Sequence, residues 1–579
     1  MKKQIRLLLS FALVAPASLL ATKCCDCDTV GHTFYTVRPN FQSASAEKLT
    51  MFRDRMDTRK DGRGGALQLV PFVSRSTKTE DLRHYFYPTC KRKLTVKEQG
   101  AYIYIDTAAA NESGEAFDDT IDIIGQHFRI LTKNGMIKLR GAAGIGIDGT
   151  DLSDAILSTS EVFESTICMS PRQTVFGVGL TWKHNLNTLF DKEDSDYTWW
   201  FEVSSPLVRV KNDLNFVEDK IEKGGGVYDS AISGLDEDYE FFGNMTDAFQ
   251  QKAWNYGKIP SKCCDKTKTR LADIELKLGT QWVHEDACKL EGYFGVLIPT
   301  GNKVKACYMF EPIVGHNRHF GIIKGGSACF RVWDDFDEGK SVHFTTDFHG
   351  MYLFEKCEKR SFDLKGKPWS RYMEVYADKA QATQASTLWA TDSTRHAAIL
   401  LATPGINVFT RDLQVKPRIS FNCTSAIVFK DEDRSFEGEV GYNFYCRQKE
   451  CVRLDCKWDP EVAFKGRFGQ GQTSPLGTIN DPGNRFIVDT TATNFALKSV
   501  QIFRELNSYD ESIIKEADLD LESAAHPAIF SHTFHVSAGK TWDERDYPLL
   551  LSAVASYEFG CCNAAISRFM IGIKGGISF

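Results

Sequence analysis

The sequence lacks a long apolar helix in its interior, and it also lacks an excess of basic residues. Its only long apolar run is residues 7–21, so no later segment is long enough to cross a bilayer as a helix. The formal net charge of the 579 residues is −6, whereas nucleic-acid-binding proteins present a concentrated basic face. These absences argue against a helical membrane protein and against a nucleic-acid partner.

The apolar run near the start predicts a secretory signal peptide over residues 1–22. It follows Lys2 and Lys3, it is short, and it ends among small residues such as Ala17. A lipoprotein signal needs a small residue immediately before the cysteine that is lipidated, and Lys23 occupies that place before Cys24. The chain is therefore expected to be exported without a lipid anchor.

Seventeen cysteines are many for an exported bacterial chain, and the oxidising surroundings favour disulfides. No second C-x2-C pair follows the one at Cys24 and Cys27, so we expect neither a metal site nor a cofactor. We expect disulfides in loops, and the candidates are Cys446, Cys451 and Cys456. Because the count is odd, at least one thiol is free or is paired with another chain.

Several long segments alternate strictly between apolar and polar side chains, which is the pattern of a strand with one apolar face. Examples are residues 271–283, 341–354 and 436–444. Strands of soluble proteins usually have about 5–6 residues, whereas strands that cross a membrane need roughly 9–11. The alternating segments are at the longer end, so they favour membrane-spanning strands.

The last such segment reaches the end of the chain. Phe569, Ile571, Ile573 and Phe579 alternate there with polar or small residues. A final amphipathic strand that ends in Phe resembles the C-terminal signature of Gram-negative outer-membrane β-barrels, which their assembly machinery reads. The resemblance implies an all-β chain that forms an antiparallel transmembrane β-barrel in the bacterial outer membrane. Membrane lipid would be one partner, and the assembly machinery would be another through the strand that ends at Phe579.

The family also places its C-terminus in the periplasm, so strand directions follow backwards from Phe579. Descending strands are then expected near 174–184, 271–283, 318–333, 417–429, 529–542 and 566–579. Ascending strands are expected near 163–170, 197–210, 289–299, 341–354, 435–447 and 549–559. The long connections 211–270, 300–317, 355–416 and 448–528 then all lie outside the cell. The connections inside are short, and such asymmetry is typical of these barrels.

The earlier part of the chain is less regular. Residues 101–107 and 125–132 are candidates for a first pair of strands, which would make about fourteen strands within a range of twelve to sixteen. Residues 23–100 lack sustained alternation and are expected to be a plug, a tail or the first strands. The expected domains are therefore the signal peptide, this N-terminal segment and a barrel over residues 101–579.

Lipid accepts only the apolar face of each strand, because a Lys or Arg facing the bilayer midplane costs about 2–4 kcal/mol. The charged face must then line the lumen. The lumen-facing candidates are Asp273, Glu275, Lys277, His343, Asp347, Glu437, Glu439 and Lys574. A barrel of about fourteen strands has an interior wider than side chains can fill, so the lumen is expected to be either wet or plugged.

Aromatic residues recur where the expected strands descend to the periplasm, as in the interfacial girdle of such barrels. These residues are Trp182, Trp282, Trp333, Phe429, Trp542 and Phe579.

The function expected first is a porin-type channel for the passive diffusion of small hydrophilic solutes, and not an enzyme. One alternative is a barrel transporter for hydrophobic small molecules. Its only support is the stretch 297–301, which resembles a strand-end motif of such transporters. Another alternative is a structural outer-membrane protein, because the cysteine content resembles that of cysteine-rich major outer-membrane proteins of obligate intracellular bacteria. Further expected partners of the protein are other copies of the same chain in a homo-oligomer, or neighbouring proteins linked to it by disulfides.

Overall fold

The structure is a computed structural model of the chain. It describes residues 31–42, 44–53, 55–56, 64–77, 82–83, 85–87, 93–99, 102–106, 120–124, 164–189, 197–222, 244–262, 266–284, 288–335, 337–366, 369–372, 374–378, 380–381, 384, 403–458, 462–464, 513–560 and 564–579. The expected signal peptide and Cys24 to Cys27 lie outside these residues. Among the described residues, no helix combines the length and the apolar character needed to span a bilayer.

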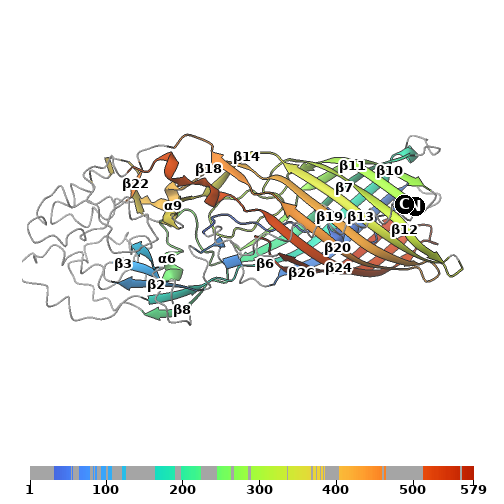
Figure 1. The fold of residues 1–579 in the computed structure, drawn as a ribbon, viewed down its shortest axis with the longest axis horizontal. Coiled ribbons are helices and arrows are strands. Elements are labelled where there is room, and N and C mark those ends of the chain that lie inside the picture. The colour runs from blue at the N-terminus through green and yellow to red at the C-terminus, as the bar shows by residue number, and fades with distance from the viewer. Residues whose placement is uncertain are drawn as a thin grey trace, which may run out of the picture.

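Twelve antiparallel strands close into a barrel with strongly tilted strands (Figure 1). Each strand pairs with the next barrel strand along the chain, and the first strand, β1, pairs with the last, β26. Closure leaves no free sheet edge. The strands are β1 (Gly65–Ser76), β6 (Arg172–Asn185), β7 (Tyr197–Asp213), β10 (Ile274–His284), β11 (Cys288–Ile298), β12 (Gly321–Asp335), β13 (Lys340–Leu353), β19 (Arg418–Asp431), β20 (Phe436–Arg447), β24 (Ile529–Trp542), β25 (Leu549–Gly560) and β26 (Arg568–Ser578). A further strand, β9 (Thr267–Leu271), pairs with the last residues of β7 and leads into β10.

The two-residue period of the sequence places one set of side chains inside the barrel and the other set outside. On β26, Phe569, Ile571 and Ile573 are exposed on the outer face, whereas Arg568, Met570 and Lys574 are buried. The strands have 11 to 17 residues, which is enough to cross the apolar part of a bilayer.

The barrel confirms the all-β fold and the expected range of strand number. All six expected descending strands and five of the six ascending strands lie in it. The ascending strand expected at 163–170 is wrong. Its counterpart, β5 (Glu164–Cys168), belongs to a separate five-stranded sheet with β2 (Leu94–Gln99), β3 (Tyr102–Asp106), β4 (Thr120–Ile124) and β8 (Val217–Glu222). The barrel strand expected at 101–107 is wrong too, because β3 lies in this sheet. Its expected partner at 125–132 lies outside the described part of the chain.

The first barrel strand is β1, inside the expected N-terminal segment, so pairing starts the barrel at Gly65 and not at residue 101. Its alternation is hidden in the sequence because Val70 and Phe72 are apolar although they point inward. They pack on Phe41, which lies in the lumen, and so this part of the inner face has no need of polar side chains.

The two ends of the barrel differ. At the end that holds the C-terminus, which we call the turn end, β10 joins β11, β12 joins β13, and β19 joins β20 through connections of three or four residues. At the opposite end, which we call the cap end, long connections pack around one apolar cluster, the cap core. Large members of the cap core are Phe249, Trp254, Phe310, Trp369, Tyr372, Phe409 and Trp458.

Among the described residues, the cap elements besides the five-stranded sheet are short. The strands are β14 (Lys356–Ser361), β15 (Asp363–Leu364), β16 (Glu374–Tyr376), β17 (Thr403–Pro404), β18 (Thr410–Lys416), β21 (Cys451–Leu454), β22 (Ala463–Phe464) and β23 (Leu519–Asp520). The cap helices are α6 (Met245–Ala248), α9 (Gly405–Val408), η5 (Ser370–Tyr372), η9 (Glu516–Asp518) and η10 (Leu521–Ala524). The remaining helices are η4 (Asn187–Leu189) at the turn end and α2 (Ala46–Leu49), which lies inside the barrel.

Candidate functional site

A segment from the N-terminal part of the chain occupies the barrel lumen. We call residues 40–56 the plug segment, within which the structure describes 40–42, 44–53 and 55–56. Residues just before it belong to the cap, since Tyr35 and Val37 are part of the cap core. At its other end, the carbonyl of Arg55 accepts a hydrogen bond from Ser578 Oγ beside the C-terminus. The chain therefore runs through the barrel from the cap end to the turn end before β1 begins.

Three basic side chains of the plug segment form ion pairs with the barrel wall. Lys48 Nζ lies 2.8 Å from Glu275 Oε2 on β10 and 3.2 Å from Glu202 on β7. Arg53 bridges two strands, with Nε 2.9 Å from Asp347 on β13 and Nη1 3.1 Å from Glu439 on β20. These ion pairs are buried. Removing one partner would leave the other charge buried without a counter-ion.

A third basic residue fastens the lower end of the plug segment. Arg55 Nη2 lies 3.0 Å from Glu437 on β20, and Nη1 lies 3.2 Å from Asp543 in the turn after β24. Asp543 is half exposed, so this second contact is worth less than the buried ones.

Wall side chains also bind the backbone of the plug segment. Lys574 on β26 donates from Nζ to the carbonyls of Ala46 and Thr50 at 3.1 and 2.6 Å. Thr424 on β19 donates from Oγ1 to the carbonyl of Ala44. The ammonium group of Lys574 is fully buried, and these carbonyls are its hydrogen-bond acceptors in place of water.

Packing at the upper end of the plug segment is aromatic. The rings of Phe41 and Phe72 stack with centroids 6.4 Å apart, and Phe41 lies directly on Gly179 of β6. A Cβ atom at Gly179 would come within 2.0 Å of the Phe41 ring, so only glycine lets the ring reach the wall there. Phe41 and Met51 have φ of 67° and 58°, a region that is costly for residues other than glycine.

Two cavities lie beside the plug segment among the described residues. One cavity of about 60 Å³ lies between Lys48, Phe52 and the wall residues Trp200 and Tyr293. A second cavity, of about 20 Å³, lies beside Arg55 and His343. A water molecule needs roughly 10–15 Å³ on this scale. Each of these two cavities therefore has room for only a few water molecules.

All eight lumen-facing candidates lie on the inner face of the barrel or at its inner rim, and they fall into two groups. Five contact the plug segment through their side chains: Glu275, Asp347, Glu437, Glu439 and Lys574. Lys277 forms ion pairs with carboxylates of the wall. His343 Nε2 is hydrogen-bonded to Ser341 Oγ. Asp273 lies between β9 and β10, where its carboxylate accepts hydrogen bonds from the backbone N–H groups of His316 and Gly301.

The sequence reasoning missed the other half of the site, namely Lys48, Arg53 and Arg55. They lie in a segment without alternation, and their partners are about 150 to 490 residues away in the chain. One signal was present. Five of the eight candidates, Asp273, Glu275, Asp347, Glu437 and Glu439, are carboxylates, and an acidic wall inside a membrane requires cations from elsewhere.

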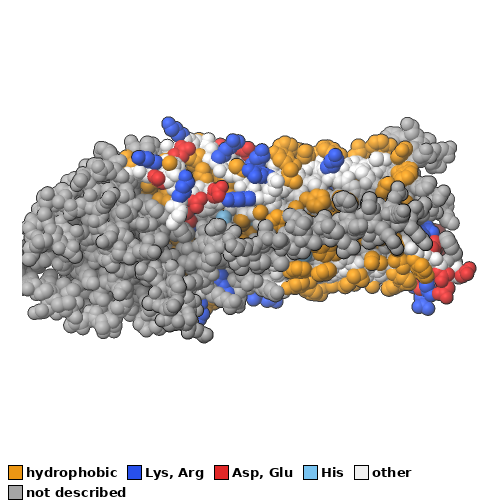
Figure 2. Space-filling view, viewed as in Figure 1, with side chains coloured by type: hydrophobic (Ala, Val, Ile, Leu, Met, Phe, Trp, Pro, Cys, Tyr) orange, Lys and Arg blue, Asp and Glu red, His pale blue; other side chains and the backbone are white. Residues whose placement is uncertain are grey.

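The outer face of the barrel carries large apolar side chains that are freely accessible. Val440, Ile427 and Phe534 are 65, 59 and 57% exposed. Figure 2 shows the apolar side chains along the barrel, with charged side chains toward both of its ends. A soluble monomer rarely exposes so large an apolar surface, whereas lipid accepts it and a closed barrel satisfies every backbone group there. The chain is an outer-membrane β-barrel protein.

The expected girdle residues lie near the turn end of this apolar face. Trp182, Trp282, Trp333 and Phe429 are exposed, and Trp542 and Phe579 are half-buried. Tyr197 and Trp199 of β7 are exposed at the same level and were missed, because only descending strands were considered. Amphipathic rings at one edge of an apolar belt are placed where an interfacial girdle would lie.

Solved structures match the chain at low sequence identity and low TM-score. No family model and no curated protein matches the chain. An outer membrane channel from Pseudomonas putida F1 has 8% identity over 89% of this chain and 95% of its own, with a TM-score of 0.32. The transport unit of the autotransporter AIDA-I from Escherichia coli has 7% identity over 92% and 94%, with a TM-score of 0.31. A Pseudomonas aeruginosa FadL homologue has 8% identity over 95% and 98%, with a TM-score of 0.25.

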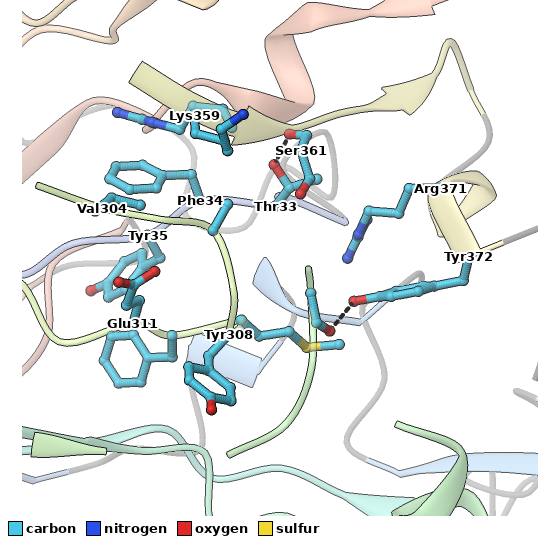
Figure 3. A pocket seen from close by; sticks show the side chains of 15 residues that line it. Thr33, Phe34, Tyr35, Val304, Tyr308, Glu311, Lys359, Ser361, Arg371 and Tyr372 are labelled. Atoms are coloured by element: carbon cyan, nitrogen blue, oxygen red, sulfur yellow. Dashed lines mark hydrogen bonds between the residues drawn. The ribbon is translucent and has the colours of Figure 1, made fainter. Parts of the chain in front are cut away.

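The cap holds the chain just before it enters the lumen. Figure 3 shows Thr33, Phe34 and Tyr35 among side chains from four other parts of the cap. Thr33 donates from Oγ1 to the carbonyl of Ser361, and the guanidinium of Arg360 lies over the ring of Phe34. Residues 33–35, which precede the plug segment, are thus part of the cap.

A buried ionic cluster ties this region together. Arg360 lies 2.8 Å from Glu358 and 3.1 Å from Glu450, and it donates to the carbonyl of Ala524 at 2.9 Å. Burial opposes ionisation of Glu450, but the Arg360 guanidinium beside it holds its pKa at about 2. Burial and Arg360 also compete at Glu358, and the net effect is a pKa below the usual range. Both carboxylates are therefore ionised at neutral pH.

The expected loop disulfide is not formed. Cys446, Cys451 and Cys456 are all free. Cys446 lies on the outer face of β20, whereas Cys451 and Cys456 are exposed on the cap surface. The separation arises because β20 ends at Arg447 and the chain turns into another sheet, β14–β18–β21.

Proposed function

We propose that the protein transports small hydrophilic solutes across the outer membrane through a lumen that its own plug segment closes. The observation that carries the proposal is the course of residues 40–56 along the lumen, held by Lys48, Arg53 and Arg55 on wall carboxylates. A permanently open porin-type pore would need a continuous water-filled path beside this segment. Cavities of about 60 and 20 Å³ support a gated path instead.

The polar character of the inner wall supports hydrophilic solutes. Once the plug segment moves, the path would be lined by side chains such as Thr181, Asn443 and Ser531, together with the charged residues that the plug segment now engages. A hydrophobic solute would need an apolar route, and these polar groups favour water in its place. The transporter for hydrophobic molecules is therefore the weaker alternative.

Single-channel conductance in planar lipid bilayers tests the proposal, with the full chain and two variants. In Arg53→Gln/Arg55→Gln, both arginines lose their charge, and Asp347, Glu437, Glu439 and Asp543 each lose an ion pair. Breaking a buried ion pair costs about 3–5 kcal/mol, and 1.4 kcal/mol is tenfold in an equilibrium. We expect the native chain to open rarely and the variant to open at least about tenfold more often.

The matched control is Lys540→Gln/Arg545→Gln, which removes the same two charges at the outer edge of the turn end. It should conduct like the native chain. Steady conductance of the native chain at the level of the double variant would overturn the closing role of the plug segment. Insertion of all three proteins without conductance would reject transport by diffusion.

A structural role is a second candidate because Cys451 and Cys456 are exposed and free. Thiols at the cap surface are placed to form disulfides with neighbouring proteins. A band of higher mass on non-reducing gels of whole cells would support this role, provided that Cys451→Ser/Cys456→Ser removes it. Cys423→Ser, a change in the barrel wall, should leave the band in place.

A further inference from the structure

The outer face of the barrel carries a group of basic side chains at the cap end. We call Arg75 on β1, Arg172 on β6, and Arg209 and Lys211 on β7 the basic patch. Arg75, Arg209 and Lys211 are exposed, and Arg172 is half-buried. Within the part of the chain that the structure describes, no hydrogen bond or ion pair engages any of these four side chains. Most basic side chains inside the barrel, by contrast, are paired with carboxylates.

The strand register brings these side chains together. Thr174 of β6 is the cross-strand neighbour of both Arg75 and Lys211, so all three lie in one row on the same face. Neighbouring strands lie roughly 4.8 Å apart, which puts Arg75 and Lys211 about 10 Å from each other. Arg209 is the neighbour of Phe176 in the next row down, and Arg172 lies in the row above.

The basic patch lies at the upper boundary of the apolar belt. Val73 and Phe176 are exposed in the row of Arg209, and Leu207 is exposed in the row below it. Phe176 is both the cross-strand neighbour of Arg209 and, at 56%, one of the most exposed aromatic side chains of the protein. The change from apolar to basic residues therefore takes place within two rows, at the level where lipid tails give way to headgroups.

An acidic side chain lies in the strand register beside the basic patch, but it already has a basic partner. Asp213 is the cross-strand neighbour of Arg172, but its carboxylate accepts a hydrogen bond from Lys266 Nζ at 2.9 Å. The outer edge of the turn end is different in kind. Its connections carry Glu338, Asp433, Asp543 and Asp546 beside a smaller number of basic residues.

We propose that the basic patch binds the phosphate groups of anionic lipid headgroups in the leaflet that surrounds the cap end. Arginine presents several N–H donors in a fork that matches phosphate oxygens, and three of the four residues are arginines. The row of apolar side chains below would contact the acyl chains of the same lipid. The basic patch has no other counter-ion within the described residues, and a phosphate at this level supplies one.

The test measures lipid that stays bound after detergent extraction, by native mass spectrometry of the folded full chain. The protein is refolded into phosphatidylcholine vesicles that contain the phosphorylated glycolipid lipid A, and in parallel into vesicles that contain its dephosphorylated form. The variant is Arg209→Gln/Lys211→Gln. The matched control is Lys540→Gln/Arg545→Gln, which also loses one arginine and one lysine, but at the turn end.

We expect the native chain and the control to retain phosphorylated lipid, and the basic-patch variant to bind it about 30-fold more weakly. None of the proteins should retain the dephosphorylated lipid. Equal retention by the basic-patch variant and the control would overturn the proposal, and so would retention that does not depend on phosphate. If the double variant fails to fold, Arg75→Gln on a separate strand serves in its place. No conductance enters the readout, so the outcome is independent of the proposed transport function.

Discussion

The barrel and the cap are built on opposite principles. In the barrel, apolar side chains such as Val440 and Ile427 face outward, and the interior holds Lys574, Glu275 and Glu439, each almost fully buried. In the cap, aromatic residues such as Trp369 and Phe409 fill the centre, as in a soluble domain. The barrel thus has apolar side chains facing lipid and charged side chains inside, whereas the cap has apolar side chains inside, as a protein in water does.

One short stretch of chain passes through both environments. Tyr35 is buried in the aromatic cap core, and Arg53, 18 residues later, pairs with two wall carboxylates. The comparison teaches that the plug segment is held by apolar packing at one end and by ionic contacts at the other. Changes to the two regions should therefore be separable.

The largest effect is expected from removing a large side chain of the cap core. Trp369 is 1% exposed, contacts Phe249 and Tyr372 edge to face, and donates from Nε1 to the carbonyl of Phe86 at 2.8 Å. Trp369→Ala should destabilise the cap by about 3–5 kcal/mol and leave the barrel folded. Hydrogen exchange of cap amides, compared with the heat-modifiable gel mobility of the barrel, measures the two separately.

Trp199→Ala is the control for this change, because Trp199 is exposed at the turn end. It should leave the exchange of cap amides unchanged. If Trp369→Ala unfolded the barrel as well, the two regions would form one cooperative unit and the comparison would fail.

The next largest effect contrasts two neighbouring residues of β26. Ile573 is 55% exposed on the outer face, whereas Lys574 is fully buried on the inner face. Ile573→Lys places a lysine next to Lys574 in the sequence, but on the face that meets lipid. This substitution should lower the free energy of unfolding by about 2–4 kcal/mol. Urea unfolding of the protein in lipid vesicles measures the cost, and Ile573→Val is the conservative control. A cost below about 1 kcal/mol would mean that this face does not meet the apolar part of the bilayer.

The contrast between the lipid-facing and inward-facing sides of each strand also explains how much of the fold could be predicted from the sequence. Strands such as β13 and β26 were predicted because one face meets lipid and the other does not, and so the alternation is unbroken. β1 was missed because Val70 and Phe72 face an aromatic ring in the lumen. Strand prediction from alternation thus fails where the interior is apolar.

The site was only half accessible for a different reason. Wall residues such as Glu439 belong to strands with alternating apolar and polar side chains, and this alternation predicts that they point inward. Arg53 has no such pattern, and its partners are 294 and 386 residues away. The cap core likewise arises from loops that share no period, so only the lengths of its connections were predicted.

A smaller effect is expected from acid, and only in the cap. The pKa of Glu450 is about 2 in the folded protein and about 4.3 in an unfolded chain. A carboxylate whose pKa is depressed by folding contributes stability above the unfolded pKa, and this contribution is lost as the pH falls from about 4.3 toward 2. The slope is about 1.4 kcal/mol per pH unit for this one group.

Protection of amides around Arg360 should therefore fall between pH 4.3 and 2, as measured by brief hydrogen exchange at each pH. Glu450→Gln provides the comparison, because the variant cannot titrate at this position. It should be less stable at neutral pH and should lose less on acidification. An identical pH profile for the native chain and the variant would contradict the assignment to Glu450.

The smallest effect is expected from a single hydrogen bond between the barrel and the plug segment. Thr424 Oγ1 donates to the carbonyl of Ala44, and Thr424→Val keeps the shape of the side chain but removes this donor. It also removes an acceptor of Asn443 Nδ2, which retains Asn422 Oδ1. The loss of one such bond costs about 1 kcal/mol, which is roughly fivefold in the balance between the closed and open lumen. Thr346→Val is the matched control, since its hydroxyl bonds Ser425 on the outer face of the same two neighbouring strands. Bilayer recordings should then show more frequent openings for Thr424→Val alone. Equal opening frequencies in both variants would mean that the hydrogen bonds of the plug segment do not govern closure, and that the ion pairs of Arg53 and Lys48 hold it by themselves.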